Sequence, residues 1–265
     1  MPTIFQYDFM IRAFIAGAII AIVAPVIGIF LVVRRYSMLS DTLAHVSLVG
    51  VAGSIAFNFN PIAGALIASI LAAIGMERLR QTRKFFSESV LSLFLSGSLA
   101  VAIIMLGLAH GLNVNIFSYL FGSIATVSAF DVGIIALCGV AVLGTIAVLF
   151  KRFFIVSYDE ELAQANGLPV TLLSLVLMVM AAVTVSISMR VVGILLVGAL
   201  MVIPVLSATQ FGRSFFKTAV IAAAISLLAV MSGLFVSFYL DLPSGGTIVL
   251  ITLVLFIASL SLNKK

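Results

Sequence analysis

The chain has 265 residues, of which 63% are hydrophobic and 9% are charged, and its formal net charge is +5. Soluble domains carry roughly 25% charged residues, so this composition excludes an ordinary soluble domain. The single cysteine, Cys138, excludes an intrachain disulfide and a cysteine-cluster metal site. Apolar stretches of about 20 residues recur along the chain, which predicts an all-α polytopic membrane protein with one transmembrane domain, residues 1–265.

About nine membrane-spanning helices are expected in chain order. They cover residues 9–33, 38–57, 61–76, 87–109, 131–150, 170–188, 191–211, 216–239 and 244–262. The apolar segment 116–127 is too short to cross a bilayer, so we expect an interfacial or re-entrant piece there. The N-terminus lacks the basic region and the cleavage site of a signal peptide, and the first apolar stretch is therefore expected to be a retained span.

The basic residues predict the orientation of these spans. Nine crossings put all but two of the 14 Lys and Arg residues on one side, the exceptions being Arg12 and Arg190. The residues on that side are Arg34, Arg35, Arg78, Arg80, Arg83, Lys84, Lys151, Arg152, Arg213, Lys217, Lys264 and Lys265. By the positive-inside rule that side is cytoplasmic, which places the N-terminus outside and the C-terminus inside. The positive net charge then needs no nucleic-acid partner.

The segment "SDTLAHVSLVG", residues 40–50, contains an unusual pair of ionisable residues. In a helix, Asp41 and His45 lie one turn apart on the same face. His45 follows Arg35 by about 15 Å of helix, close to the middle of a bilayer core about 30 Å thick. A structural role would make Asp41 a first-turn acid and His45 a hydrogen-bonded neutral histidine. Ionisable groups inside a membrane are costly and normally functional, which favours a working pair.

A carboxylate and an imidazole at this spacing can contact one divalent cation. The combination suits zinc and, with more oxygen ligands, manganese. Two protein ligands are too few for a closed structural site, and this suits a transport path in which the ion binds and then leaves. We therefore predict that Asp41 and His45 handle a metal ion, with further ligands supplied from elsewhere.

The longest loop on the basic side, Lys151–Pro169, is expected to form a short helical segment at about 157–169. Ser157 and Glu160 have the S-x-x-E spacing of a capping box, and Glu160 and Glu161 suit the positive end of the helix dipole. A helix of two turns is too short to be stable alone in water, so we expect it to rest against another surface. The alternative is an ordinary connector on the membrane surface.

Two further acids are candidates for the pathway or a gate. Glu88 begins the fourth expected span next to Arg83 and Lys84, so a first-turn acid beside cations is the simpler interpretation. Asp241 lies in "YLDLPSGG", where it is either an outer turn residue or part of an entrance.

The chain contains no G-x-x-x-x-G-K-[ST] motif, so it cannot hydrolyse ATP in the P-loop manner. The H-E-x-x-H and G-x-S-x-G spacings of proteases do not occur either.

Five segments resemble the membrane permeases of the zinc, manganese and iron family of bacterial ABC importers. They follow in the family's order and cover nearly the whole chain: "RRYSMLSDTLAHVSLVGVA", "FSYLFGSIATVSAFDV", "DEELAQANGLP", "MRVVGILLVGALMVIPVLSA" and "FYLDLPSGGTIVL". The form "GDTLAHxSLxGV" is closer to zinc members than to manganese members. Ser40 stands where the family often has glycine, and this change leaves Asp41 and His45 intact.

The resemblance implies an importer with several components. It implies a homodimer of permease chains, cytoplasmic ATPase subunits and an extracytoplasmic metal-binding protein that delivers the ion. It also implies that "DEELAQANGLP" is the coupling helix, with Glu160 and Glu161 in the segment and Ala163 and Gly167 in close contact with the ATPase. Zinc is the expected cargo, with manganese or ferrous iron as alternatives, and no permanently bound cofactor is implied. A stand-alone secondary transporter remains a third hypothesis.

Overall fold

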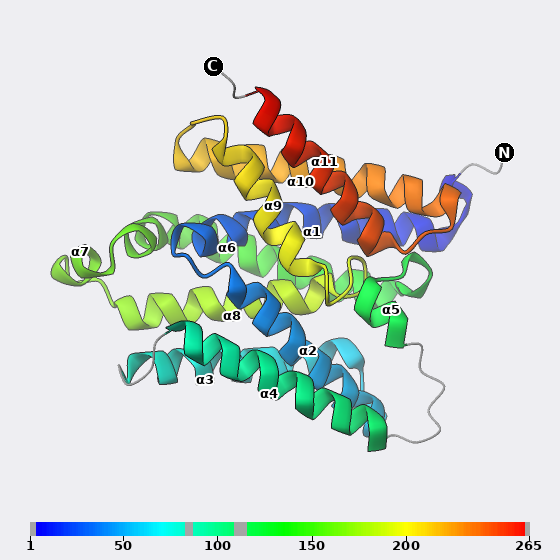
Figure 1. Cartoon of the computed structure of the whole chain (residues 1–265), viewed down its shortest axis with the longest axis horizontal. Coiled ribbons are helices and arrows are strands. Elements are labelled where there is room, and N and C mark those ends of the chain that lie inside the picture. Colours follow the sequence, from blue (N-terminus) through cyan, green and yellow to red (C-terminus); the bar gives the residue numbers. More distant parts are fainter. Residues whose placement is uncertain (1–3, 83–86, 109–115, 263–265) are drawn as a thin grey trace.

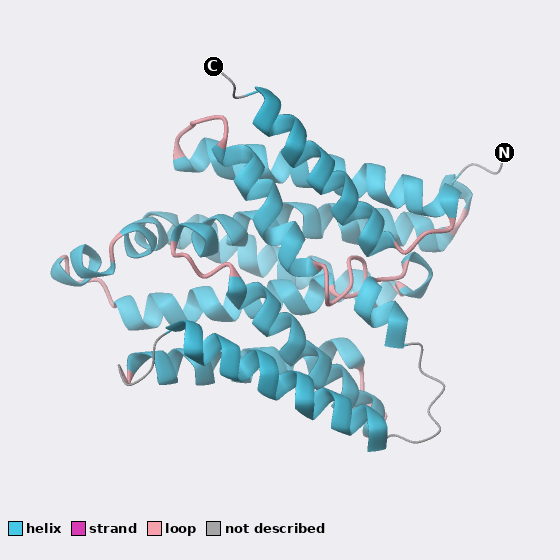
Figure 2. Cartoon of the chain, viewed as in Figure 1, coloured by secondary structure: helices cyan, strands magenta, loops and turns pink. Residues whose placement is uncertain are grey.

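The structure is a computed structural model that describes residues 4–82, 87–108 and 116–262. Every regular element in these ranges is a helix (Figure 2). The elements are η1 (Ile4–Gln6), α1 (Asp8–Val33), α2 (Met38–Ala56), α3 (Pro61–Gln81), α4 (Ser87–Leu108), α5 (Ile116–Phe121), η2 (Ile124–Thr126), α6 (Ala129–Tyr158), α7 (Glu160–Ala165), α8 (Val170–Ser188), α9 (Val197–Thr209), α10 (Phe215–Leu240) and α11 (Ser244–Leu262).

Eight helices in the described ranges are long and apolar enough to cross a membrane. They are α1, α2, α3, α4, α6, α8, α10 and α11. The prediction of an all-α polytopic membrane protein is therefore confirmed, and most expected spans agree closely with these helices. Two helices continue beyond their apolar segments, α3 as far as Gln81 and α6 as far as Tyr158. Of the basic residues used to orient the chain, Arg83, Lys84, Lys264 and Lys265 lie outside the described residues.

The span expected at 191–211 is shorter than predicted. The chain turns through residues 189–196 before α9 begins, and Gly193 has a left-handed φ of 87°. The amide of Ile194 donates to the carbonyl of Tyr119 in α5 at 2.9 Å. Non-helical backbone inside a membrane protein needs such partners, and here α5 supplies them. From this turn α9 runs back towards the end of the bundle that carries α7 (Figure 1).

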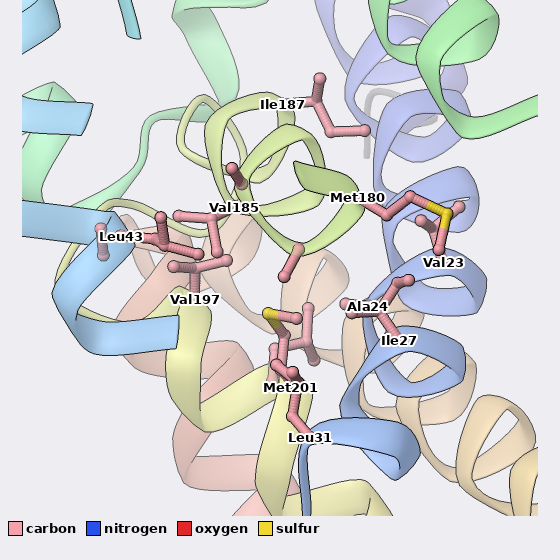
Figure 3. Close-up of a cluster of buried hydrophobic side chains, with 14 of the residues drawn as sticks. Val23, Ala24, Ile27, Leu31, Leu43, Met180, Val185, Ile187, Val197 and Met201 are labelled. Atoms are coloured by element: carbon pink, nitrogen blue, oxygen red, sulfur yellow. The ribbon is translucent and has the colours of Figure 1, made fainter. Parts of the chain in front are cut away.

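Helix α1 is the central element of the bundle and contacts α6, α8, α9 and α10 (Figure 1). Figure 3 shows part of the buried core, to which α1, α2, α8 and α9 contribute Val23, Ala24, Ile27, Leu31, Leu43, Met180, Val185, Ile187, Val197 and Met201. A side-chain carbon at Gly28 would overlap the carbonyl oxygen of Met201. The absence of a side chain at Gly28 therefore lets α1 and α9 pack with their backbones in contact.

The short helix expected at 157–169 begins later than the capping-box spacing predicts. Ser157 is buried within the last turn of α6, so the predicted capping box between Ser157 and Glu160 is wrong. The N-cap of α7 is Asp159, whose carboxylate accepts from the amide of Leu162 at 2.9 Å. Asp159 has the extended backbone that an N-cap needs, with φ −152°, whereas Ser157 keeps helical geometry.

Candidate functional site

Asp41 and His45 lie on the face of α2 that the described residues leave partly open. Helix α2 contacts α3, α4, α8 and α9. Between the two residues, Thr42, Leu43 and Ala44 are buried, whereas Asp41 is exposed and His45 is partly exposed. The side chains of Asp41 and His45 therefore share the less buried face of α2.

The imidazole of His45 is oriented by its own helix. Its Nδ1 lies 2.8 Å from the carbonyl oxygen of Asp41. A carbonyl oxygen can only accept a hydrogen bond, so Nδ1 carries the proton and donates it. The lone pair of the neutral ring is then on Nε2, which is the tautomer that a metal-binding histidine needs.

Helix α9 passes very close to the carboxylate of Asp41 at Gly198. A side-chain carbon built at Gly198 would overlap Oδ1 of Asp41 and would lie 3.1 Å from Oγ of Ser40. The missing side chain leaves the space that the carboxylate occupies. Gly198 is thus part of the candidate site, and sequence reasoning missed it although it lies in the segment "MRVVGILLVGALMVIPVLSA".

The described part of the chain holds no group of three or more His, Cys, Asp and Glu residues that could bind a metal ion. Asp41 and His45 therefore offer one carboxylate and one imidazole nitrogen at this site. Zinc in proteins is usually four-coordinate, and manganese takes more ligands. A bound ion would complete its coordination with water or with groups from outside this chain.

Among the described residues, neither of the other two candidate pathway acids joins this pair in a group that could hold a metal ion. Glu88 is exposed in the first turn of α4. Asp241 is the left-handed C-cap of α10, with φ 52°. It lines a pocket of about 690 Å³ together with Phe9 in the first turn of α1. Because Asp41 follows the other end of α1, Asp241 and Asp41 belong to opposite halves of the bundle.

The residues expected to contact an ATPase divide between two faces of α7. Glu161 and Gly167 are exposed, and Gly167 has the left-handed φ of 72° that ends the helical turn. Ala163 is fully buried within this chain, and Glu160 is half-buried. The outward surface of α7 therefore contains Glu161 and Gly167, whereas the side chain of Ala163 packs inward.

A cluster of charged and polar side chains binds Glu160 at the start of α7. It consists of Arg34, Tyr36, Glu77, Arg80 and Glu160, and we name it the Glu160 cluster. Arg34 and Arg80 both donate to the carboxylate of Glu160, Arg80 over 3.3 Å. Arg80 also forms two hydrogen bonds of 2.9 Å with Glu77. The sequence shows the acids and the cations but not their pairing, because the partners lie far apart along the chain.

A second buried ion pair explains one of the two exceptions to the charge rule. Arg190 lies 3.8 Å from Asp131, and both side chains are largely buried. The guanidinium group also sits 5.0 Å from the ring centre of Tyr119 in α5. Asp131 completes a capping box with Ser128 at the start of α6. Arg190 is therefore neutralised inside the protein at the turn between α8 and α9.

Comparison with known proteins gives a consistent result over the full length. The model of the ABC 3 transport family matches residues 6–263. A relative from Haemophilus influenzae, the high-affinity zinc uptake system membrane protein ZnuB, is 27% identical over 98% of this chain and 100% of its own length. A relative from Listeria monocytogenes, the manganese transport system membrane protein MntC, is 30% identical over 98% of this chain and 93% of its own length.

A solved structure has the same fold. It is PsaBC from Streptococcus pneumoniae in complex with Fab, and the matching chain has a TM-score of 0.86 and 30% sequence identity. The match covers 97% of this chain and 92% of that one. The helical bundle, the family model and the full-length relatives agree, and the chain belongs to the ABC 3 transport family of membrane permeases.

Proposed function

We propose that the chain is the permease subunit of an ATP-driven importer that moves a divalent transition-metal ion, with zinc as the first candidate, across the bacterial cytoplasmic membrane. The observation that carries the proposal is the pair Asp41 and His45 on the open face of a membrane helix. Family membership and the zinc and manganese relatives support it. The ion is cargo, and ATP hydrolysis belongs to a separate subunit.

In this proposal Asp41 and His45 bind the ion during its passage. The carboxylate supplies negative charge, and Nε2 of His45 supplies a neutral nitrogen whose orientation is fixed by the hydrogen bond at Nδ1. Two ligands from the chain bind the ion weakly enough for it to leave again. Gly198 keeps space beside the carboxylate, so movement of α9 against α2 would open or close this site.

A second copy of the chain covers the open face in this proposal. An exposed carboxylate on a membrane helix is expensive when it faces lipid, so protein or a wet cavity is needed next to Asp41. Large apolar side chains are also exposed nearby in the chain, at Met38 in α2, Leu195 in the turn before α9 and Leu206 in α9. A homodimer that buries this face would place two Asp41–His45 pairs along one path.

Two further partners act at opposite ends of the bundle. On the cytoplasmic side, the outward surface of α7 with Glu161, Leu162 and Gly167 docks on an ATPase subunit. On the extracytoplasmic side, the pocket lined by Phe9 and Asp241 receives the metal-delivering protein. This assignment puts the N-terminus outside and the C-terminus in the cytoplasm, as the basic residues predict.

Manganese or ferrous iron is the second candidate for the cargo. A carboxylate and an imidazole fit these ions as well when more oxygen ligands are supplied, and the Listeria relative is named for manganese.

Uptake into proteoliposomes that contain the permease and its ATPase, with labelled zinc and unlabelled manganese in competition, separates the candidates. We expect zinc to be taken up with ATP and manganese to compete poorly. Preferential manganese uptake would replace zinc as the cargo, and uptake by the chain alone would favour a secondary transporter.

A further inference from the structure

The acid at the start of α7 is held from inside by two other helices. Arg34, the C-cap of α1, donates to Glu160 and also to Oγ of Ser174 in α8, the latter at 2.8 Å. Arg80, in the last turn of α3, donates to both carboxylate oxygens of Glu160 at 3.3 and 3.4 Å. Glu160 thus connects α7 with the ends of α1 and α3, and Arg34 adds a contact to α8.

The cluster is largely buried and its charges balance. The side chain of Arg34 is 4% exposed and that of Glu77 is 1% exposed, so both are withdrawn from solvent, whereas Glu160 at the edge of the cluster is 40% exposed. Two arginines face two glutamates, and Arg80 grips Glu77 through both of its carboxylate oxygens. Such paired arginine forks have a fixed geometry. Removing Arg80 would leave the buried carboxylate of Glu77 without its arginine, so the geometry favours keeping these charges together.

The same cluster reaches the helix that carries the candidate metal site. The hydroxyl of Tyr36 accepts from Arg80 at 3.1 Å, and the guanidinium groups of Arg34 and Arg80 lie 5.3 and 5.9 Å from the centre of its ring. Tyr36 precedes the first residue of α2 by two positions, and its carbonyl accepts from the amide of Leu39 at 2.9 Å. Asp41 lies in that first turn of α2.

We infer that Arg34, Tyr36, Arg80 and Glu160 form a link that carries movement of α7 to the start of α2, and so to Asp41. Helix α7 joins α6 and α8 through the backbone, and hydrogen bonds of the cluster connect it with α1, with α3 and, through Tyr36, with the start of α2. Arg34, Tyr36 and Arg80 are therefore positioning residues that couple the ATPase to the metal site. This inference rests on the proposed function, in which α7 docks on the ATPase.

The test compares two neighbouring arginines in the purified permease–ATPase complex in proteoliposomes. Arg34→Gln removes a charge from the cluster, and Arg35→Gln removes the same charge from the exposed next position. We measure ATP hydrolysis and zinc uptake in the same vesicles. Allosteric coupling energies correspond to changes of about 5- to 150-fold, so Arg34→Gln should lower the zinc taken up per ATP hydrolysed by about fivefold or more. Arg35→Gln should keep the wild-type ratio.

A wild-type ratio in Arg34→Gln overturns the inference. If Arg34→Gln does not assemble with the ATPase, Tyr36→Phe decides, because it removes only the hydroxyl that accepts from Arg80 and keeps the ring. Tyr36→Phe should assemble, hydrolyse ATP and show a lowered uptake per ATP, and a wild-type ratio in it overturns the inference. Loss of ATP-dependent uptake by the unmodified complex would instead contradict the proposed function.

Discussion

His45 and Asp41 illustrate what single residues contribute to this protein. Their positions in a membrane helix could be predicted from the sequence, because the spacing of four places both side chains on one helical face whatever the rest of the fold. The tautomer of His45 and the role of Gly198 could not be predicted. The first depends on the distance from Nδ1 to the carbonyl of Asp41, and the second on the approach of α9, which is remote in sequence.

The space beside Asp41 is tested by Gly198→Ala. The added methyl would overlap the carboxylate, so we expect metal uptake to fall strongly and the free energy of unfolding to drop by roughly 1–3 kcal/mol, the usual cost of overpacking. Gly133→Ala is the matched control, because a side-chain carbon there meets no atom within 4 Å. Uptake assays and thermal unfolding of both variants check this. Equal behaviour of the two variants would show that Gly198 has no special role.

At the scale of elements, α9 and α7 show where the sequence misleads. The apolar stretch at 191–211 is long enough to suggest a full span, but hydropathy does not reveal that the chain turns before α9 and that the amides of Ile194 and Leu195 pair with α5. Ser157 and Asp159 compete for the same capping role, and the choice depends on where α6 ends. The short helix after α6 could be predicted from the acids Glu160 and Glu161 in its first turn. The burial of Ala163 on its inward face could not be predicted from the sequence.

The inward face of α7 is tested by Ala163→Leu. Ala163 is fully buried, so a larger side chain has to displace α7 and should lower the free energy of unfolding by roughly 1–3 kcal/mol. Ala165→Leu makes the same change at an exposed position two residues further and should leave stability nearly unchanged. Thermal unfolding in detergent measures both. A stable Ala163→Leu variant would mean that α7 is free to shift on the bundle.

At the scale of the whole molecule, the sequence predicts the fold class because each long membrane-spanning helix can be recognised from the hydropathy of its own residues. The way the helices pack is a different matter. The central position of α1, its backbone contact with α9 at Gly28 and the convergence of Arg34 and Arg80 on Glu160 all depend on contacts between distant segments. The open face of α2 is likewise a property of the assembled bundle, and it motivates the proposal of a second copy.

The orientation of the bundle is tested by labelling with a thiol reagent that does not cross membranes. In a background carrying Cys138→Ser, we introduce Leu242→Cys beside the outer pocket or Leu162→Cys on α7, both at exposed positions. In intact cells that lack the ATPase subunit and are freed of any outer barrier, we expect the cysteine at 242 to react and the cysteine at 162 to react only after lysis. The reverse pattern would contradict the proposed topology.

Asp41 and His45 are proposed to bind the transported ion, and loss of the His45 imidazole is the sharpest test of that role. The measurement is ATP-dependent uptake of labelled zinc into proteoliposomes by the complex carrying His45→Ala, with ATPase association and ATP hydrolysis measured in parallel. We expect the variant to assemble with its ATPase and to take up no zinc above the background of empty vesicles. Zinc uptake at the wild-type rate by the well-assembled variant would contradict the proposed role.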